Sequence, residues 1–201
     1  MKELDFITVD GGFGGDQNRL ATYFQRLGGC GAVTAADLSI YLSRRFPALR
    51  GLYPGPDGPL TQTEYQAFFE TVKPFLHPRI GGIARLKQYT DGFADYAASR
   101  GVSVAFETLP GGAPVEQAEA FVRRAIDRGL CPAFLLLLHD DPALDDITWH
   151  WFLLTGYEDT PAGMQVAYAT WGKRHVLSLP HLWNTGHPGQ GGLVVIKPKE
   201  N

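Results

Sequence analysis

One cysteine stands among glycines, in the segment Gly28-Gly29-Cys30-Gly31-Ala32. The apolar residues that follow predict a buried helix over 31–45, which places the thiol in the first turn of that helix. Free backbone N–H groups and the helix dipole favour negative charge there, so this position is expected to lower the cysteine pKa. The pattern is typical of a thiolate nucleophile, although a small residue that only begins a helix would also fit it.

A thiol nucleophile needs a base, and the sequence offers six histidines. His150 differs from the others because it begins a predicted strand, Trp149-His150-Trp151-Phe152, whose tryptophans can shield the imidazole from water. A core histidine bonded to a backbone carbonyl is the competing interpretation. The other five stand beside prolines, in turns or in exposed stretches: His77, His139, His175, His181 and His187.

Three motifs, in order and spacing, resemble those of the papain-like cysteine peptidases. That family places its cysteine at the start of a central helix, its histidine in H-x5-G-Y, and then a strand that ends in N-S-W-G. Here Gly29-Cys30-Gly31-Ala32 is followed by His150 with Gly156-Tyr157, and later by Ala169-Thr170-Trp171-Gly172. The strand predicted over 192–197 resembles the family's last barrel strand. The likeness covers most of the chain and is greatest to short, bacterial, prodomain-free relatives.

The resemblance implies a role for several residues. Cys30 would be the nucleophile, and His150 would accept its proton and later protonate the leaving group. Trp171 would cover the imidazole and keep the site dry. Gly29, Trp149 and Trp151 are expected to contact the substrate beside Trp171.

The residue that should orient the histidine departs from the family pattern. The family's Asn falls on Ala169, which cannot hydrogen-bond an imidazole. Thr170 is the possible orienter, but strand alternation points it to the opposite face from Ala169 unless the strand is bulged. Asp159 and Asp146 are loop carboxylates that offer an alternative.

Two glutamines are candidates for the side-chain donor that the family directs at the oxyanion. Gln17 stands 13 residues before Cys30, after residues 11–15, a glycine-rich run expected to be a flexible loop. Gln25 stands 5 residues before Cys30, where residues 20–27 would form a helical turn with Gln25 on its surface. Gln17 is favoured, because functional polar residues are common on loops, and Gln25 remains the alternative.

Composition limits the other function classes. The chain has 201 residues, of which 44% are apolar and 19% charged, with a net charge of −3, so one domain with a real core is expected. Binding to nucleic acid or to an anionic membrane through net charge alone is not expected. No apolar run approaches the ~20 residues of a membrane helix, and the first residues do not form a signal peptide, which favours the cytoplasm.

The remaining cysteine and the other polar residues add no further chemistry. Cys131 precedes Pro132 at the head of an apolar strand and is expected to be a buried, inert thiol. No Cys/His cluster has zinc spacing, so no metal and no cofactor are expected. A peptide or protein is the expected substrate, and the sequence does not indicate an oligomeric state.

The predicted helices lie mostly in the first half of the chain and the predicted strands mostly in the second half, which indicates an α+β fold. Helices are expected over 31–45, from a cap at Thr61 or Thr63 to about 73, over 83–99 and over 114–128, and strands over 102–106, 131–138, 151–157, 164–170, 174–179 and 192–197. The resemblance implies a single papain-like domain over 1–201, with a helical lobe over about 15–100, a half-barrel sheet lobe over about 101–201, and a cleft between them.

Three function hypotheses follow. The first is a cysteine peptidase or amidohydrolase that cleaves a peptide or isopeptide bond through an acyl-enzyme. The second is a catalytically impaired papain-fold binding protein, which Ala169 favours. The third is an acyl or amide transferase of the same fold.

Overall fold

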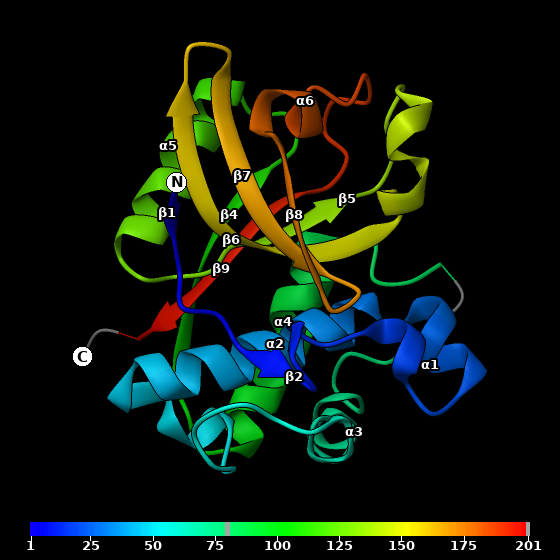
Figure 1. Ribbon diagram of the computed structural model, residues 1–201, viewed down its shortest axis with the longest axis vertical. Coiled ribbons are helices and arrows are strands. Elements are labelled where there is room, and N and C mark those ends of the chain that lie inside the picture. The colour runs from blue at the N-terminus through cyan, green and yellow to red at the C-terminus, as the bar shows by residue number, and fades with distance from the viewer. Residues whose placement is uncertain (79–80, 200–201) are drawn as a thin grey trace.

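The computed structural model describes residues 1–78 and 81–199. Helices form most of the N-terminal part, and an antiparallel sheet forms most of the C-terminal part, as Figure 1 shows. The predicted α+β segregation is therefore confirmed. Among the described residues, no helix combines the length and apolar character needed to cross a membrane.

Helix α2 (Cys30–Arg45) is the central element of the helical part, and it is buried from Cys30 to Ser43. It begins after Gly29, where any side chain would collide with the preceding turn, because a Cβ there would lie 2.2 Å from the Gln25 carbonyl oxygen. It ends at Phe46, whose extended backbone precedes Pro47. Around it lie α1 (Tyr23–Gly28), α3 (Gln62–Val72), α4 (Leu86–Ser99) and the 3-10 helices Gln17–Arg19 and Pro47–Leu52.

The main sheet has the strand order β4-β9-β5-β6-β7-β8, and every pairing in it is antiparallel. Strand β1 (Lys2–Glu3) pairs with β6 beyond the end of β5, so the N-terminus belongs to this sheet. Helices α5 (Val115–Asp127) and α6 (Leu179–Trp183) pack against it (Figure 1). The six long strands are β4 (Val104–Pro110), β5 (Ala133–Leu136), β6 (His150–Thr160), β7 (Gly163–Thr170), β8 (Lys173–Ser178) and β9 (Gly192–Pro198).

The glycine-rich run at 11–15 is not the flexible loop that the sequence predicts. Strand β3 (Gly12–Phe13) pairs with β2 (Thr8–Val9) across a turn of Asp10 and Gly11, whose φ values are 47° and 79°. Two residues of positive φ are typical of the tight turn that matches strand twist. The hairpin is then fixed from both sides, because Phe13 N–H donates to Gly172 O over 2.8 Å and Gly14 N–H donates to Ile7 O over 3.0 Å.

Most predicted elements are present, with shifted bounds. The helix expected from residue 83 begins at Leu86, and the strand expected over 102–106 runs from Val104 to Pro110. The strand expected over 131–138 pairs only from Ala133 to Leu136. Apolar runs indicate what is buried, whereas bounds depend on where partner strands and caps are present.

Helix α3 shows which of two threonines is the cap. Thr61 Oγ1 accepts from Glu64 N–H over 3.2 Å, and the Glu64 carboxylate accepts from Thr61 N–H over 2.8 Å, which completes a capping box. Thr63 lies inside the helix and is exposed.

We therefore expect Thr61→Ala to lower the free energy of unfolding by about 1 kcal/mol, because it removes the acceptor for an otherwise unpaired N–H group. Thr63→Ala is the matched control and should change stability by less than about 0.5 kcal/mol. Urea unfolding followed by circular dichroism measures both. Equal losses in the two variants would contradict the assignment of the cap.

Candidate active site

The pairing of β6 with β7 determines which side chain lies beside His150. Leu153 is paired with Ala169, so the next residue along β7, Thr170, is opposite Phe152 and shares a face with His150. Thr170 Oγ1 lies 2.6 Å from His150 Nε2. The expectation that Thr170 needs a bulge to reach the ring is therefore wrong, because Ala169 is the residue on the opposite face. The bulge in this strand pair is on β6, between Leu154 and Gly156.

Trp171 covers the imidazole. The two rings are stacked, with centroids 4.7 Å apart and an interplanar angle of 23°. Trp171 and Gly172 form the two-residue turn between β7 and β8, with φ values of 49° and 68°. A tryptophan with positive φ is strained, and this turn holds the indole over His150.

Cys30 and His150 line the same small cavity. Residues from α2, β6, β7 and the segment after β3 meet there: Gly15, Gln17, Cys30, Val33, Thr34, Asp37, His150, Trp151, Ala169, Thr170 and Trp171. Cys30 is 5% exposed and His150 is 7% exposed, so solvent hardly reaches either group. No hydrogen bond joins the Cys30 thiol to the imidazole in the part of the chain that the structure describes.

Burial controls the ionisation of both groups. It raises the pKa of the Cys30 thiol above its ordinary value, and the backbone N–H groups of Trp151, Gly31 and Cys30 only partly oppose this effect. The N–H groups at the start of α2 do lower the thiol pKa, as expected, but burial outweighs them, so the net expectation of a lowered pKa is wrong for this closed state. Burial also lowers the pKa of His150 to about 4. At neutral pH the pair is an uncharged thiol beside an uncharged imidazole.

The two glutamines have different surroundings. Gln17 lines the cavity, where its Nε2 donates to Arg26 O over 2.7 Å, and its buried Oε1 has no hydrogen-bond partner among the described residues. Gln25 is part of the α1 capping box with Thr22, and its Nε2 donates to Glu70 over 2.6 Å. Gln25 does not line the cavity, and it is buried, so the expectation that it lies on the surface of its helical turn is wrong: it caps α1 and joins that helix to α3.

The residues expected to contact substrate are placed unequally. Trp151 lines the cavity, stacks on Tyr89 at 4.2 Å and donates from Nε1 to Ile83 O over 2.7 Å. Trp149 lies outside it and is 54% exposed. Gly29 gives α2 its close approach to α1. Asp159, an alternative orienter, is paired with Arg123 instead.

Asp37 is a site residue that the sequence analysis missed. It lies seven residues after Cys30 on α2, lines the same cavity and is buried. Its carboxylate accepts from Gly15 N–H over 3.0 Å and from Tyr65 Oη over 2.7 Å. Burial raises its pKa to about 7. The signal was an acidic residue within an otherwise apolar helix, a position where an unpaired charge is costly.

The cavity is closed from the side of the N-terminal hairpin. Phe13 N–H donates to Gly172 O, and Gly172 N–H donates to Gly15 O over 3.1 Å. These bonds tie the segment after β3 to the turn that carries Trp171. Gly15 allows this close packing, because a Cβ there would lie 2.1 Å from Tyr65 Oη. This segment therefore covers the cavity that Cys30 lines, and the thiol is almost closed to solvent.

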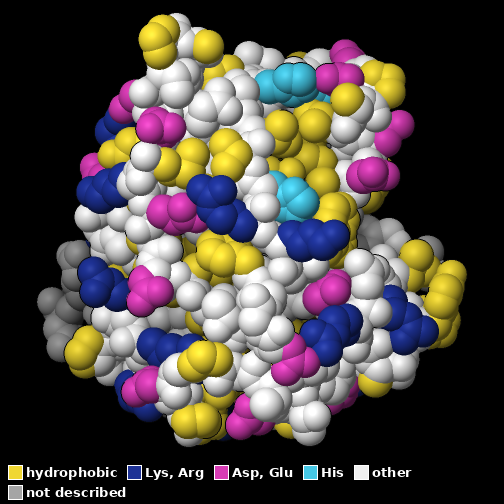
Figure 2. Space-filling model, in the orientation of Figure 1, with side chains coloured by type: hydrophobic (Ala, Val, Ile, Leu, Met, Phe, Trp, Pro, Cys, Tyr) yellow, Lys and Arg dark blue, Asp and Glu magenta, His cyan; other side chains and the backbone are white. Residues whose placement is uncertain are grey.

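The surface that precedes Cys30 along the chain is apolar. Helix α1 ends at Gly28, and its side chains Tyr23, Phe24 and Leu27 are 65%, 60% and 57% exposed. Figure 2 shows hydrophobic side chains gathered over this helix. Among the described residues, no group of three or more His, Cys, Asp or Glu side chains is arranged to hold a metal ion.

Comparison with known proteins adds no family. No protein-family model matches the sequence, and no curated protein matches it.

The raised pKa of Asp37 predicts a pH-dependent stability. Between the ordinary value of 3.8 and about 7, the folded chain keeps a proton on Asp37 that the unfolded chain releases. The contribution of this group to stability therefore falls as pH rises through that window, by at most about 1.4 kcal/mol per pH unit. Relative to the parent chain, Asp37→Asn should gain stability steadily from pH 5 to pH 7.

Urea unfolding at half-unit pH steps measures this difference. The low pKa of His150 acts in the opposite direction, but it is present in both proteins and cancels in the comparison. Asp91→Asn, at an exposed position on α4, is the control and should show no such trend. A parallel pair of pH profiles for the parent and Asp37→Asn would contradict the raised pKa.

Proposed function

We propose that this protein is a papain-like thiol hydrolase that cleaves a peptide or isopeptide bond through an acyl-enzyme on Cys30. One observation carries the proposal: the thiol at the tip of α2 lines the same cavity as an imidazole that is hydrogen-bonded by Thr170 and covered by Trp171. Such a reaction needs a nucleophile, a base, a group that orients the base and a group that shields the site from water.

The chemistry uses the uncharged pair. His150 is unprotonated at neutral pH and so is able to accept the thiol proton as Sγ attacks the substrate carbonyl carbon. The C–S bond forms, and the C–N bond breaks as the imidazolium returns the proton to the leaving amine. Water then attacks the thioester, gives its proton to His150, and releases the acid and the free thiol.

Gln17 and the start of α2 would stabilise the oxyanion. The backbone N–H groups of Cys30 and Gly31 point to the sulfur, where a tetrahedral intermediate would form. Gln17 Nε2 has a second hydrogen beyond the one it gives to Arg26 O. The exposed apolar side chains of α1, just before Cys30, offer a surface for an apolar stretch of a peptide or protein substrate.

A second candidate function is a papain-fold binding protein that does not turn substrate over. The observation that favours it is the closed state of the site, in which burial opposes ionisation of both Cys30 and His150. Thr170 also replaces the family's Asn as the partner of the imidazole, and its rotating hydroxyl, which can donate or accept, does not by itself select one imidazole tautomer.

Alkylation separates these functions. We expect iodoacetamide to label Cys30 at least ten times faster than Cys131, whose sulfur donates to Leu154 O in the core, because opening of the cover exposes only the first. Because burial raises the thiol pKa, the Cys30 rate should increase about tenfold per pH unit from pH 7 to 9. Mass spectrometry of the peptides containing each cysteine measures both rates.

The matched control is Cys131→Ser, which should leave the Cys30 rate unchanged. Equal and slow labelling of both cysteines would overturn the hydrolase proposal and leave the binding protein. A labelling rate that is already maximal below pH 7 would instead show a thiolate–imidazolium pair and contradict the uncharged resting state.

Thr170 provides a test of the orienting contact. Thr170→Val keeps the shape but removes the hydroxyl, so the His150 ring loses its partner, and Cys30 reactivity should fall roughly tenfold, the effect of a lost buried hydrogen bond. Thr170→Ser keeps the hydroxyl and should retain most of the reactivity. Alkylation rates and the ¹⁵N spectrum of the imidazole report the change, and equal behaviour of the two variants would exclude an orienting role.

A further inference from the structure

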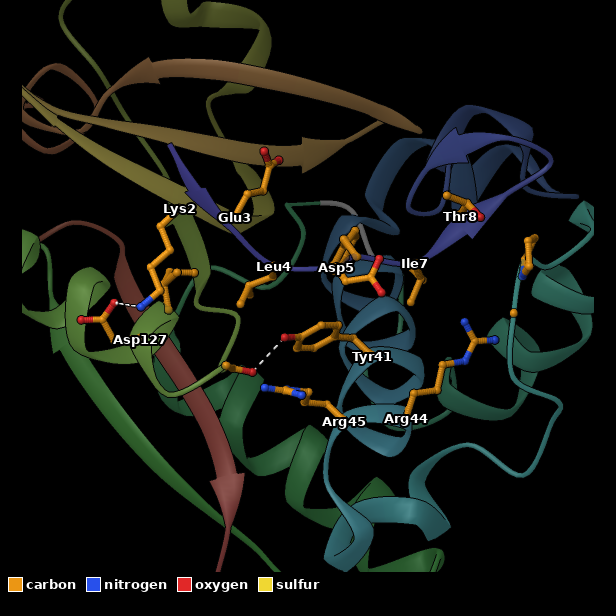
Figure 3. A pocket seen from close by; sticks show the side chains of 15 residues that line it. Lys2, Glu3, Leu4, Asp5, Ile7, Thr8, Tyr41, Arg44, Arg45 and Asp127 are labelled. Carbon is orange, nitrogen blue, oxygen red and sulfur yellow. Dashed lines mark hydrogen bonds and ion pairs between the residues drawn. The ribbon is translucent and has the colours of Figure 1, made fainter.

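A second and larger cavity lies at the opposite end of α2 from Cys30. Figure 3 shows it beneath the extended N-terminal segment, with the last turn of α2 on the other side. Its volume is about 700 Å³, which is within the usual range for small-molecule sites. The α2 residues that line the thiol cavity lie between Cys30 and Asp37, whereas those that line this cavity lie between Tyr41 and Arg45, and the two cavities share no lining residue.

Two charged side chains in this cavity have no partner of opposite charge. Asp5 and Arg45 are both exposed, and they form no hydrogen bond or ion pair through their side chains in the described part of the chain. Both act on the hydroxyl of Tyr41, whose pKa Asp5 raises and Arg45 lowers, so both charges lie near that ring. Figure 3 shows Tyr41 from α2 between the N-terminal segment and Arg45.

The other charges in the cavity are mostly satisfied. Lys2 pairs with Asp127 at 2.6 Å, and Glu3 pairs with Arg174 at 2.7 Å. Arg44 is only partly satisfied: its Nη2 donates to Pro56 O over 2.9 Å and its Nε lies 3.9 Å from a carboxylate oxygen of Asp57, but that buried Nε has no hydrogen-bond partner among the described residues.

Cations near the end of a helix also stabilise its dipole, which would explain the presence of Arg44 and Arg45 without any ligand. That explanation leaves one side-chain atom unaccounted for, because the buried Nε of Arg44 has no hydrogen-bond partner among the described residues. Asp5 is exposed, so its carboxylate is solvated in the free protein and is available to a ligand. The backbone N–H and C=O groups of Asp5 and Phe6 are also unused by any hydrogen bond within the described residues. A ligand with polar groups along its length would satisfy all of these.

We propose that this cavity binds a zwitterion with an apolar body, of the class of amino acids and short unblocked peptides. The ligand ammonium group would face Asp5, and its carboxylate would face Arg45 and Arg44. The apolar side chains Leu4, Ile7 and Ile126 in the lining would contact the ligand's own side chains.

Charge balance favours this class over a simple anion. Three cationic residues line the cavity (Lys2, Arg44 and Arg45) and so do three acidic ones (Glu3, Asp5 and Asp127), so their formal charges sum to zero. A phosphate group would bring an excess of negative charge close to three carboxylates, whereas a zwitterion matches the separated charges without adding any.

Titration with the tripeptide Ala-Leu-Ala, followed by NMR or calorimetry, tests this proposal. The Cys30→Ser chain is used for every titration, so that the peptide cannot be cleaved and the result does not depend on thiol chemistry. We expect N-acetylation and C-amidation of the peptide each to weaken binding roughly fivefold, the upper range for a solvent-exposed ion pair.

Two added substitutions identify the partner of each charge. Asp5→Asn should weaken binding of the free peptide roughly fivefold but leave binding of the acetylated peptide unchanged. Arg45→Gln should likewise weaken binding of the free peptide roughly fivefold but leave binding of the amidated peptide unchanged. The matched control is Arg19→Gln. Arg19 lies outside the cavity and pairs with Asp10, so this substitution should not alter the binding of any of the peptides.

Three results would overturn the proposal. One is equal binding of free and doubly blocked peptides, and another is no binding of the free peptide at about ten millimolar. The third is that inorganic phosphate binds more tightly than the peptide, and that Arg45→Gln weakens phosphate binding whereas Asp5→Asn does not. That result would make the cavity an anion site.

Discussion

The packing of helix α2 against strand β6 is the contact on which the candidate active site depends. The helix is buried along nearly its whole length, so its first residue, Cys30, is held against the start of β6, where His150 stands. A buried helix cannot rotate without moving its core residues into the sheet. The thiol and the imidazole are therefore brought to one cavity by apolar packing, and neither group needs a charge to hold it there.

The same burial sets the ionisation of the site. An apolar interface disfavours charged forms, so the thiol keeps its proton, the imidazole stays neutral, and even the Asp37 carboxyl is driven towards its protonated form. The polar groups that remain are mostly hydrogen-bonded, as Asp37 is by Gly15 and Tyr65. The exception is Gln17 Oε1, which lies in the cavity where a substrate would have to enter. In the proposed reaction this closed state would be a state of low reactivity, and movement of the hairpin at β2 and β3 would give access to the thiol.

The two ends of α2 present different environments. At its N-terminus, glycines allow close contacts and the cavity is small and closed. At its C-terminus, two arginines and the extended N-terminal segment border a wide opening with separated charges. Residues of α2 line both cavities, so the helix that positions Cys30 also positions Arg44 and Arg45.

The sequence by itself determined the elements and the residue types of the site. Glycines around Cys30, the strand at His150 and the Trp171-Gly172 turn are local patterns, and each element follows from apolar periodicity and from residues suited to caps and turns. Tertiary structure alone decided which polar groups meet. Register places Thr170 beside His150, Tyr65 and Gly15 reach Asp37 from distant segments, and a paired hairpin replaces the expected flexible loop. The thiol pKa moves opposite to the local expectation for the same reason, because burial depends on everything packed around a residue and a helix terminus contributes only one part of its environment.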